Sequence, residues 1–286
     1  MKKLITLFLI LLITISSSMF SQEFQSIEGL KRRFFEKVLT ISGENDVVEG
    51  YVVYYMKEKV KKEKGKARTR IFAVKSYDKD LKPIKENTIE ITISTNILST
   101  AFNGRNLCVV LGDAPKKTIT ALSYDKNGDQ IGKNEWTVDK WYETDLDVYP
   151  SSDGFFIQKL LREKKTGFEI LRFDSYMNKK WSKKFIPEKG YTNTLITKSI
   201  GDKLVLLKMT GASIMSKKMK IELVTVDEKA GDVLGQFNLF DGTNSLIPST
   251  FRFDDDNNVI LGGMYFEGEK FRNINSKGVF VMKTDL

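Results

Sequence analysis

The chain of 286 residues contains no histidine and only one cysteine. The lack of histidine excludes Ser-His-Asp triads, histidine-ligated zinc and imidazole acid–base chemistry. A single cysteine excludes an internal disulfide, an Fe–S cluster and a four-cysteine metal site. That residue, Cys108, lies in the apolar run LCVVL, so we expect a buried and inert thiol. Oxygen-ligand sites for calcium or magnesium remain open.

Long apolar runs are absent after the N-terminus. The chain opens with the basic residues Lys2 and Lys3, followed by the apolar stretch Leu4–Ile15 and the small residues of Ser16–Ser21. This order predicts a secretory signal peptide over residues 1–21. Its apolar stretch is shorter than the roughly 20 residues of a membrane-spanning helix, although an N-terminal anchor is the alternative. No cysteine lies near its end, so we expect no lipoprotein anchor. The predicted location is secreted, periplasmic or at the cell surface, without a transmembrane span after signal removal.

The five prolines and 20 glycines do not gather into a linker, so residues 22–286 are predicted to form one domain. The most informative feature within it is a turn that recurs about every fifty residues. Its copies are Tyr77-Asp78, Tyr124-Asp125, Phe173-Asp174, Val226-Asp227 and Thr284-Asp285. Each copy follows a run with strand-like alternation or apolar content. A fixed period indicates repeated units that bury their apolar faces against one another.

Four short strands can be placed around each turn. In the second unit they are Ile97–Phe102, Asn106–Leu111, Thr118–Tyr124 and Gln130–Val138. Four antiparallel strands in roughly fifty residues are typical of a β-propeller blade. We therefore predict an all-β, β-propeller-like fold of about five four-stranded antiparallel repeats, the last incomplete. The units run roughly over 32–93, 97–138, 144–186, 193–240 and 247–286. A β-sandwich is the alternative, but a sandwich does not require repetition of its own sequence.

The two ends of the repeat array are less regular. In the first unit, Ser26–Leu39 also fits a short helix. The last unit stops where the others enter their final turn. Either an N-terminal strand from Glu23–Leu30 supplies the missing outer strand, or the reading frame is a shortened version of a longer protein. The second explanation is favoured, because Lys277–Lys283 otherwise ends a sheet as an unguarded edge.

Three features together resemble a group of secreted, β-propeller-like proteins of Bacteroidetes. They are the FSQ-type signal exit, the recurrent YDK(N/D)-type turns and the segment NNVILGGMYFEGEKFRNINSKGVFVMKTDL. The resemblance covers most of the mature chain at the level of repeats. It implies export and a propeller-like fold, and it supplies neither an agreed activity nor catalytic residues to map.

Several short motifs favour turns over chemistry. Ser76 and Ser123 each precede a lysine by three positions, as in acyl-serine hydrolases, but both recur at a strand-to-turn junction. Asp125–Asp129 lacks the glycine and glutamate positions of an EF-hand. Asp254–Asn258 is acidic enough for a calcium ion, but it occupies a loop tip of the repeat. Gly128–Lys133 is one residue too short for a P-loop. No catalytic, cofactor-binding or metal-binding residue is assigned, and no cofactor is expected.

One acidic group remains a candidate for glycosidase chemistry, which needs two carboxylates facing one cleft. Its members near the start of the third unit are Glu135, Asp145, Asp147 and Asp153, beside the aromatic residues Trp136, Trp141 and Tyr142. Sugar rings stack on such aromatic side chains. The simpler interpretation is that the aromatic residues pack between units and the acids lie on solvated turns.

The chain has a net charge of +9, and basic loops gathered on one face would attract polyanions outside the cytoplasm. The basic residues gather in two clusters, one of Lys57, Lys59, Lys61, Lys62, Lys64, Lys66, Arg68 and Arg70, and one of Lys179, Lys180, Lys183 and Lys184. Acidic polysaccharide, lipopolysaccharide and extracellular DNA are candidates, and solvated loops are the simpler explanation. Nothing resembles a dedicated nucleic-acid-binding module.

The sequence therefore predicts an exported, non-enzymatic, β-propeller-like protein that binds or scaffolds at the cell envelope. Its partner is an unknown macromolecule, with acidic polysaccharide and an envelope protein as candidates. Two alternatives remain: a carbohydrate-active enzyme with paired carboxylates, and a truncated paralogue without independent function.

Overall fold

The computed structural model describes residues 34–42, 48–59, 68–140, 145–162, 165–213, 216, 218–254, 256–268 and 276–285. They lie within one compact unit, Phe34–Leu286. The predicted signal peptide and the predicted strand Glu23–Leu30 lie outside them. Within the described ranges, no helix is long and apolar enough to cross a membrane. The described elements are all strands, which confirms the all-β prediction and corrects the helical alternative for residues 34–39.

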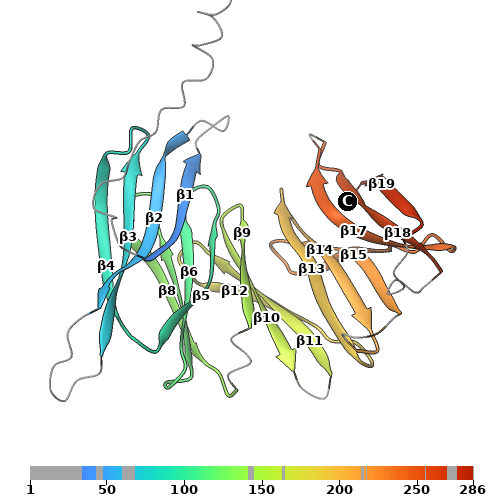
Figure 1. The fold of residues 1–286 in the computed structure, drawn as a ribbon, viewed down its shortest axis with the longest axis horizontal. Helices are drawn as coiled ribbons and strands as arrows, with labels where there is room; N and C mark the ends of the chain where they lie inside the picture. The colour runs from blue at the N-terminus through green and yellow to red at the C-terminus, as the bar shows by residue number, and fades with distance from the viewer. Residues whose placement is uncertain are drawn as a thin grey trace, which may run out of the picture. The chain divides into compact units, whose positions relative to one another are not determined.

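The first sixteen strands fall into four groups of four, and neighbouring strands within each group pair antiparallel, as predicted (Figure 1). The first sheet contains β1 (Phe34–Ser42), β2 (Val48–Lys59), β3 (Thr69–Asp78) and β4 (Pro83–Thr92). The second contains β5 (Thr95–Phe102), β6 (Leu107–Asp113), β7 (Thr118–Tyr124) and β8 (Gln130–Thr137). In both, the strand order in space follows the order in the chain.

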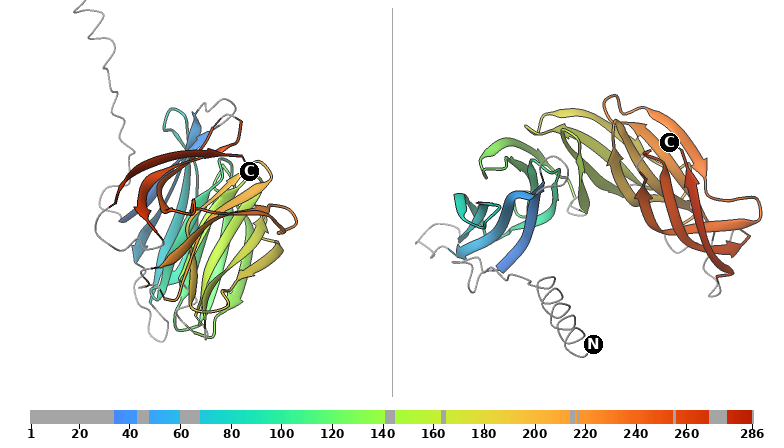
Figure 2. Two further views of the ribbon diagram at one scale, coloured as in Figure 1. Left: turned by 90° about the vertical axis from the view of Figure 1, so that its right-hand side faces the viewer. Right: turned by 90° about the horizontal axis from the view of Figure 1, so that it is seen from above.

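The next eight strands form two further groups of four. One group contains β9 (Leu146–Ser151), β10 (Gly154–Arg162), β11 (Thr166–Asp174) and β12 (Lys179–Phe185). The other contains β13 (Tyr191–Ile200), β14 (Lys203–Gly211), β15 (Met219–Asp227) and β16 (Val233–Asn238). A single parallel pair, Thr166 with Tyr191, joins the two groups. Figure 2 shows the strands of each group from two further sides.

The last sheet has three strands, β17 (Asn244–Phe253), β18 (Val259–Glu267) and β19 (Gly278–Thr284). Among the described residues, no strand pairing joins this sheet to the sheet of β1. The antiparallel four-stranded units are thus confirmed, whereas the predicted count of about five repeats remains a prediction.

The recurrent aspartate forms a turn by accepting hydrogen bonds from the backbone that follows it. Asp125 accepts from the N–H groups of Asn127 at 2.9 Å and Asp129 at 2.8 Å. Asp174 accepts in the same way from the residues two and four positions later, both at 2.9 Å. A short carboxylate satisfies backbone donors at a turn without an extra loop, which explains the repeated aspartate.

The last strand of each group of four is called its outer strand here: β4, β8, β12 and β16. Each of these four strands carries a β-bulge just after the turn. The register shift leaves one residue without a partner on the neighbouring strand, and these residues are Ile84, Ile131, Lys180 and Leu234. A bulge increases the local twist of an edge strand and disrupts the row of groups available for pairing. The bulge is therefore part of the repeated unit, although no residue type marks it in the sequence.

Apolar clusters fill the space between successive sheets. One joins β3 to β7 through Phe72 and Leu122, and the next includes Val110 and Phe155. Further clusters join β11 to β15 and β14 to β18. Cys108 is buried in the second of these clusters, and burial raises the pKa of its thiol, as expected for an inert cysteine. The sheets are stabilised by mutual packing, as the repeat predicted.

A polar contact recurs beside two of these clusters. Asn87 donates from Nδ2 to the carbonyl of Gly128, and Asn134 donates to the carbonyl of Met177 at 3.1 Å. Both asparagines lie on an outer strand, and both acceptors lie on the aspartate turn of the following sheet. The accepting residues have positive φ angles of 82° and 62°, which turn their carbonyls away from the local ladder. Successive sheets are thus joined by hydrogen bonds at their turns as well as by the apolar packing between them.

Candidate functional site

Arg172 occupies a position of the repeat that holds a small hydroxyl residue before three other copies of the turn, at Ser76, Ser123 and Thr225. It directly precedes the Phe173-Asp174 turn, as Ser76 and Ser123 precede theirs. Ser76 Oγ donates to the carbonyl of Asn127, on the turn of the following sheet, at 2.8 Å. A side chain at this position of β3 or β11 therefore points toward the next turn. At Arg172 it places a guanidinium group there.

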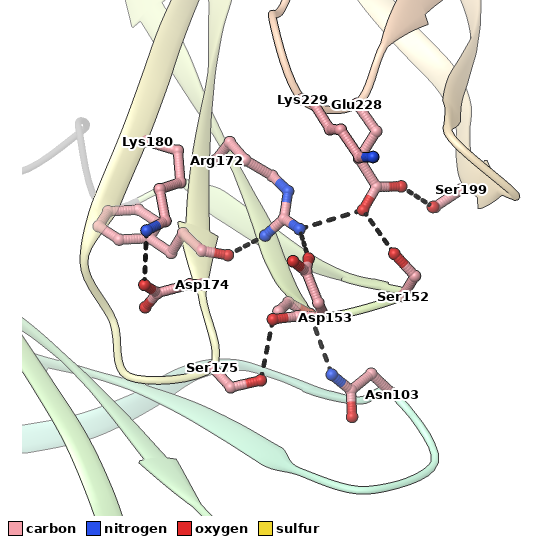
Figure 3. Close-up of polar contacts among 12 residues, drawn as sticks. Asn103, Ser152, Asp153, Arg172, Asp174, Ser175, Lys180, Ser199, Glu228 and Lys229 are labelled. Carbon is pink, nitrogen blue, oxygen red and sulfur yellow. Dashed lines mark hydrogen bonds and ion pairs between the residues drawn. The ribbon is translucent and has the colours of Figure 1, made fainter.

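The guanidinium of Arg172 is buried, with 4% of the residue exposed. Its Nη2 donates to Glu228 Oε1 at 3.0 Å and also to Asp153, while Nη1 donates to the carbonyl of Phe173. Its Cζ lies 5.1 Å from the centre of the Phe156 ring, a distance typical of a cation–π contact. Figure 3 shows the guanidinium between the two carboxylates.

Glu228, only 3% exposed, uses both carboxylate oxygens. Oε2 accepts from Ser199 Oγ at 2.6 Å, and Oε1 accepts from Ser152 Oγ at 3.1 Å in addition to Arg172. Its backbone is held too, because Trp181 Nε1 donates to its carbonyl at 2.9 Å. A buried ion pair is tolerated only when such hydrogen bonds satisfy both charged groups. The network therefore ties the group β9–β12 to the group β13–β16.

A cleft of about 440 Å³ opens beside this network. The residues that line it come from the turns of both groups: Ser152, Asp153, Arg172, Asp174, Lys180, Gly201, Asp202, Glu228 and Lys229. Lys180 Nζ lies 2.8 Å from Asp174 Oδ2. Burial raises the pKa of Asp174, but the hydrogen bonds from Lys180 and from the turn outweigh burial and lower that pKa below its ordinary value. Most charges on the cleft wall are therefore already paired within the protein.

The charged groups of this network form hydrogen bonds with one another. A general acid or base must reach a proton on a substrate. Glu228 is enclosed by two hydroxyl groups and a guanidinium, and Arg172 is held from three sides. The observed geometry fixes the relative placement of two turns.

The acids proposed from the sequence as a glycosidase pair have different partners. Glu135 lies 3.1 Å from Lys133, Asp145 lies 3.0 Å from Arg162, and Asp153 contacts Arg172. Among the described residues, the structure brings Asp153 close to the Glu228 network and does not gather it with Glu135 in one cleft.

The fourth acid of this group is Asp147, and the aromatic residues proposed beside the group are Trp136, Trp141 and Tyr142. Burial, followed by the charge of Asp145, raises the pKa of Asp147. Trp136 stacks on Phe173 with ring centres 6.3 Å apart and belongs to the core between two sheets. Trp141 and Tyr142 lie outside the described residues. Trp136 therefore acts in packing, the simpler of the two interpretations given above.

The acidic segments considered for calcium form the same turn as the repeat. Asp254 accepts from the backbone of Asn258 at 2.8 Å and lies 2.6 Å from Lys283 Nζ. The hydrogen bond from Lys283, followed by that from Asn258, lowers the pKa of Asp254 to about 2. Within the part of the chain that the structure describes, no three acidic, cysteine or histidine side chains gather as metal ligands.

The two basic clusters differ in their described members. In the first, Lys57 pairs with Glu86 and Arg70 donates to the carbonyl of Thr95, while residues 60–67 lie outside the described ranges. The second lies on β12, whose sequence KKWSKKF contains four lysines and no acid. Lys180 pairs with Asp174, whereas Lys179, Lys183 and Lys184 make no ion pair with any described residue.

A family model described as a family of unknown function, DUF6770, matches residues 1–286. The chain belongs to the DUF6770 family. No curated protein matches the chain.

Several solved structures are distantly similar to the chain. A mutant of the Synechocystis apocarotenoid oxygenase has 7% identity and a TM-score of 0.46, with 92% of this chain and 68% of that chain covered. The β-propeller domain of the trilobed protease from Pyrococcus furiosus has 12% identity and a TM-score of 0.43, covering 87% and 71%. An ACO/RPE65 chimera has 8% identity and a TM-score of 0.46, and the chain covers 57% of its length. Similarity at this level gives no information about the activity of this chain.

Proposed function

We propose that this DUF6770 protein is an exported, non-enzymatic, β-propeller-like protein that binds an acidic polysaccharide of the cell envelope. The observation that carries the proposal is the outer strand β12, whose seven residues include four lysines and no acidic residue. A row of like charges along a sheet edge raises the local concentration of a polyanion.

The other outer strands do not share this charge pattern. On β4, Lys85 is accompanied by Glu86 and Glu90, and on β8 Lys133 is paired with Glu135. Lysine also protects edge strands against pairing, but β4 and β8 achieve this with charges of both signs. Four lysines alone on β12 therefore exceed what edge protection requires.

The lysines of β12 are presented by a fixed strand. Trp181 packs against Phe156 with ring centres 5.8 Å apart, and Phe185 stacks on Phe168 at 4.8 Å. The aromatic residues anchor β12 on the core between two sheets. Lys179, Lys180 and Lys184 are exposed and Lys183 is half-buried, so little additional ordering of the strand is needed when a polymer binds.

The Arg172–Glu228 network supports the non-enzymatic part of the proposal. It gives a structural explanation for the most deeply buried ion pair among the described residues. The lack of histidine removes the most common acid–base residue from the whole chain.

A binding assay with a charge-matched control tests the proposal. Fluorescently labelled polygalacturonate is titrated with the purified full-length chain from 25 to 300 mM salt, with neutral dextran as reference. We expect polygalacturonate to bind at low salt and its affinity to fall as salt rises, because the attraction is screened.

The variant K183E/K184E is expected to bind at least tenfold more weakly. The variant K126E/K133E, with the same change in net charge on another sheet, is expected to stay within about twofold. Equal losses in both variants, or no binding by the unaltered chain, would refute the proposal.

A further inference from the structure

The outer strand β16 has the opposite character to β12. Its sequence VLGQFN contains no charged residue, and all six residues are exposed. Leu234 is 55% exposed and Phe237 is 50% exposed. In the order of strands, β16 is the last strand of its group, so one of its edges has no neighbour among the described strands.

An unprotected edge of this kind is a template for pairing with another strand. Natural proteins usually place charges, proline or a bulge on such an edge. The bulge at Leu234 is present, but after it Gly235–Asn238 continues in regular register with β15. The three other complete groups each carry charged residues at the corresponding place. β16 alone among these four outer strands offers a regular and uncharged edge.

We infer that two copies of this chain associate through antiparallel pairing of their β16 edges. The charges on the strands favour β16 over β12 as the edge for self-association. The chain carries a net charge of +9, and pairing two β12 strands would oppose lysine to lysine. Pairing two β16 strands opposes no charges. The twofold symmetry of such a pair makes the same patch complementary to itself.

The alternation of side chains defines a register for this pair. Gly235 lies opposite Thr225 on β15 and Phe237 lies opposite Leu223, so Gly235 and Phe237 share one face of the sheet. An antiparallel pair centred on Gln236 places Phe237 of each copy across from Gly235 of the other. A Cβ built on Gly235 would meet nothing within 4 Å, so this face is open to a ring. An aromatic ring that covers a glycine on the neighbouring strand stabilises sheet pairing.

Sedimentation velocity of the full-length chain between about 1 and 100 µM tests the inference. We expect a dimer that dissociates on dilution, and a change to monomer throughout this range for F237K. The matched control is I84K. Ile84 lies on the outer strand β4 and is 55% exposed, compared with 50% for Phe237, so I84K adds the same charge at a similarly exposed apolar residue. I84K is expected to dimerise like the unaltered chain. Because the substituted side chains are exposed, thermal unfolding of both variants is expected to match the parent.

Two results would overturn the inference: the unaltered chain sediments as a monomer at every concentration, or the dimer survives F237K. If V281K on β19 abolishes a dimer that survives F237K, the interface lies on a different edge. The K183E/K184E variant is expected to dimerise normally. Self-association and polysaccharide binding can therefore fail independently of each other.

Discussion

Replacing Arg172 with methionine removes the buried cation while it keeps most of the side-chain volume. The change leaves the Glu228 carboxylate beside two serine hydroxyls with no positive partner. Breaking a buried ion pair in this way costs about 3–5 kcal/mol, because the remaining charge stays away from water. For a domain of this size, that cost corresponds to a fall in Tm of roughly 6–20 °C.

A second substitution tests whether the unpaired charge causes the loss. In R172M/E228Q the glutamine is neutral, and its amide oxygen still accepts a hydrogen bond from a serine. We expect the double variant to be more stable than R172M by at least about 1 kcal/mol, even though it contains one more change. A double variant no more stable than R172M would show that lost packing, and not the buried charge, dominates.

The control is R162M, because the Arg162–Asp145 pair is exposed to solvent. An exposed ion pair contributes about 0–1 kcal/mol. All four proteins are compared by urea unfolding followed by tryptophan fluorescence, with Tm from calorimetry as a second measure. A cost for R172M as small as that for R162M would refute the role assigned to the buried network.

Three further predictions concern single residues. N134A is expected to destabilise the chain by about 1 kcal/mol in urea unfolding, since it removes the hydrogen bond to the carbonyl of Met177; no measurable change would mean that this contact between sheets is not formed. Burial raises the pKa of Glu222, but the hydrogen bonds from Lys220, from Gln236 and from Lys208 outweigh burial, so the pKa in the folded state lies below the ordinary 4.5. Ionised Glu222 therefore contributes stability above pH 4.5 that is lost as the pH falls through the lower folded pKa; Tm measured from pH 7 to 3 should fall less steeply in E222Q, and parallel curves would contradict the assignment. Cys108 is expected to react with a thiol reagent only after denaturation, because it is fully buried; rapid labelling of the native protein would show that its core cluster opens.

Local chemistry made the strands and turns predictable from the sequence. An aspartate that accepts backbone hydrogen bonds from residues two to four positions later acts within one turn, so Asp78, Asp125, Asp174 and Asp227 each carry their own signal. The alternation before each copy marks a strand for the same reason. Trp136 could also be predicted as a packing residue from its place in the repeat.

The network around Arg172 was not predictable in this way. Arg172 and Glu228 are separated by 56 positions, and in the sequence Glu228 resembles a solvated acid on a turn. One signal was available, because an arginine replaces the serine found before two other copies of the turn. That signal shows an exception to the repeat, but it does not identify the partner. The partner follows only from the tertiary structure, which brings the β15–β16 turn against the end of β11.

For the outer strands β12 and β16, too, some properties follow from the sequence and others only from the structure. The sequence by itself determined that Lys179–Phe185 is basic and that Val233–Asn238 is uncharged. It also determined the period that makes them equivalent strands. Only the tertiary structure decided that both run along sheet edges, with Trp181 and Phe185 packed inward and Leu234 and Phe237 facing solvent. The physical reason is that charge and periodicity belong to the chain, whereas exposure depends on what the neighbouring sheets cover.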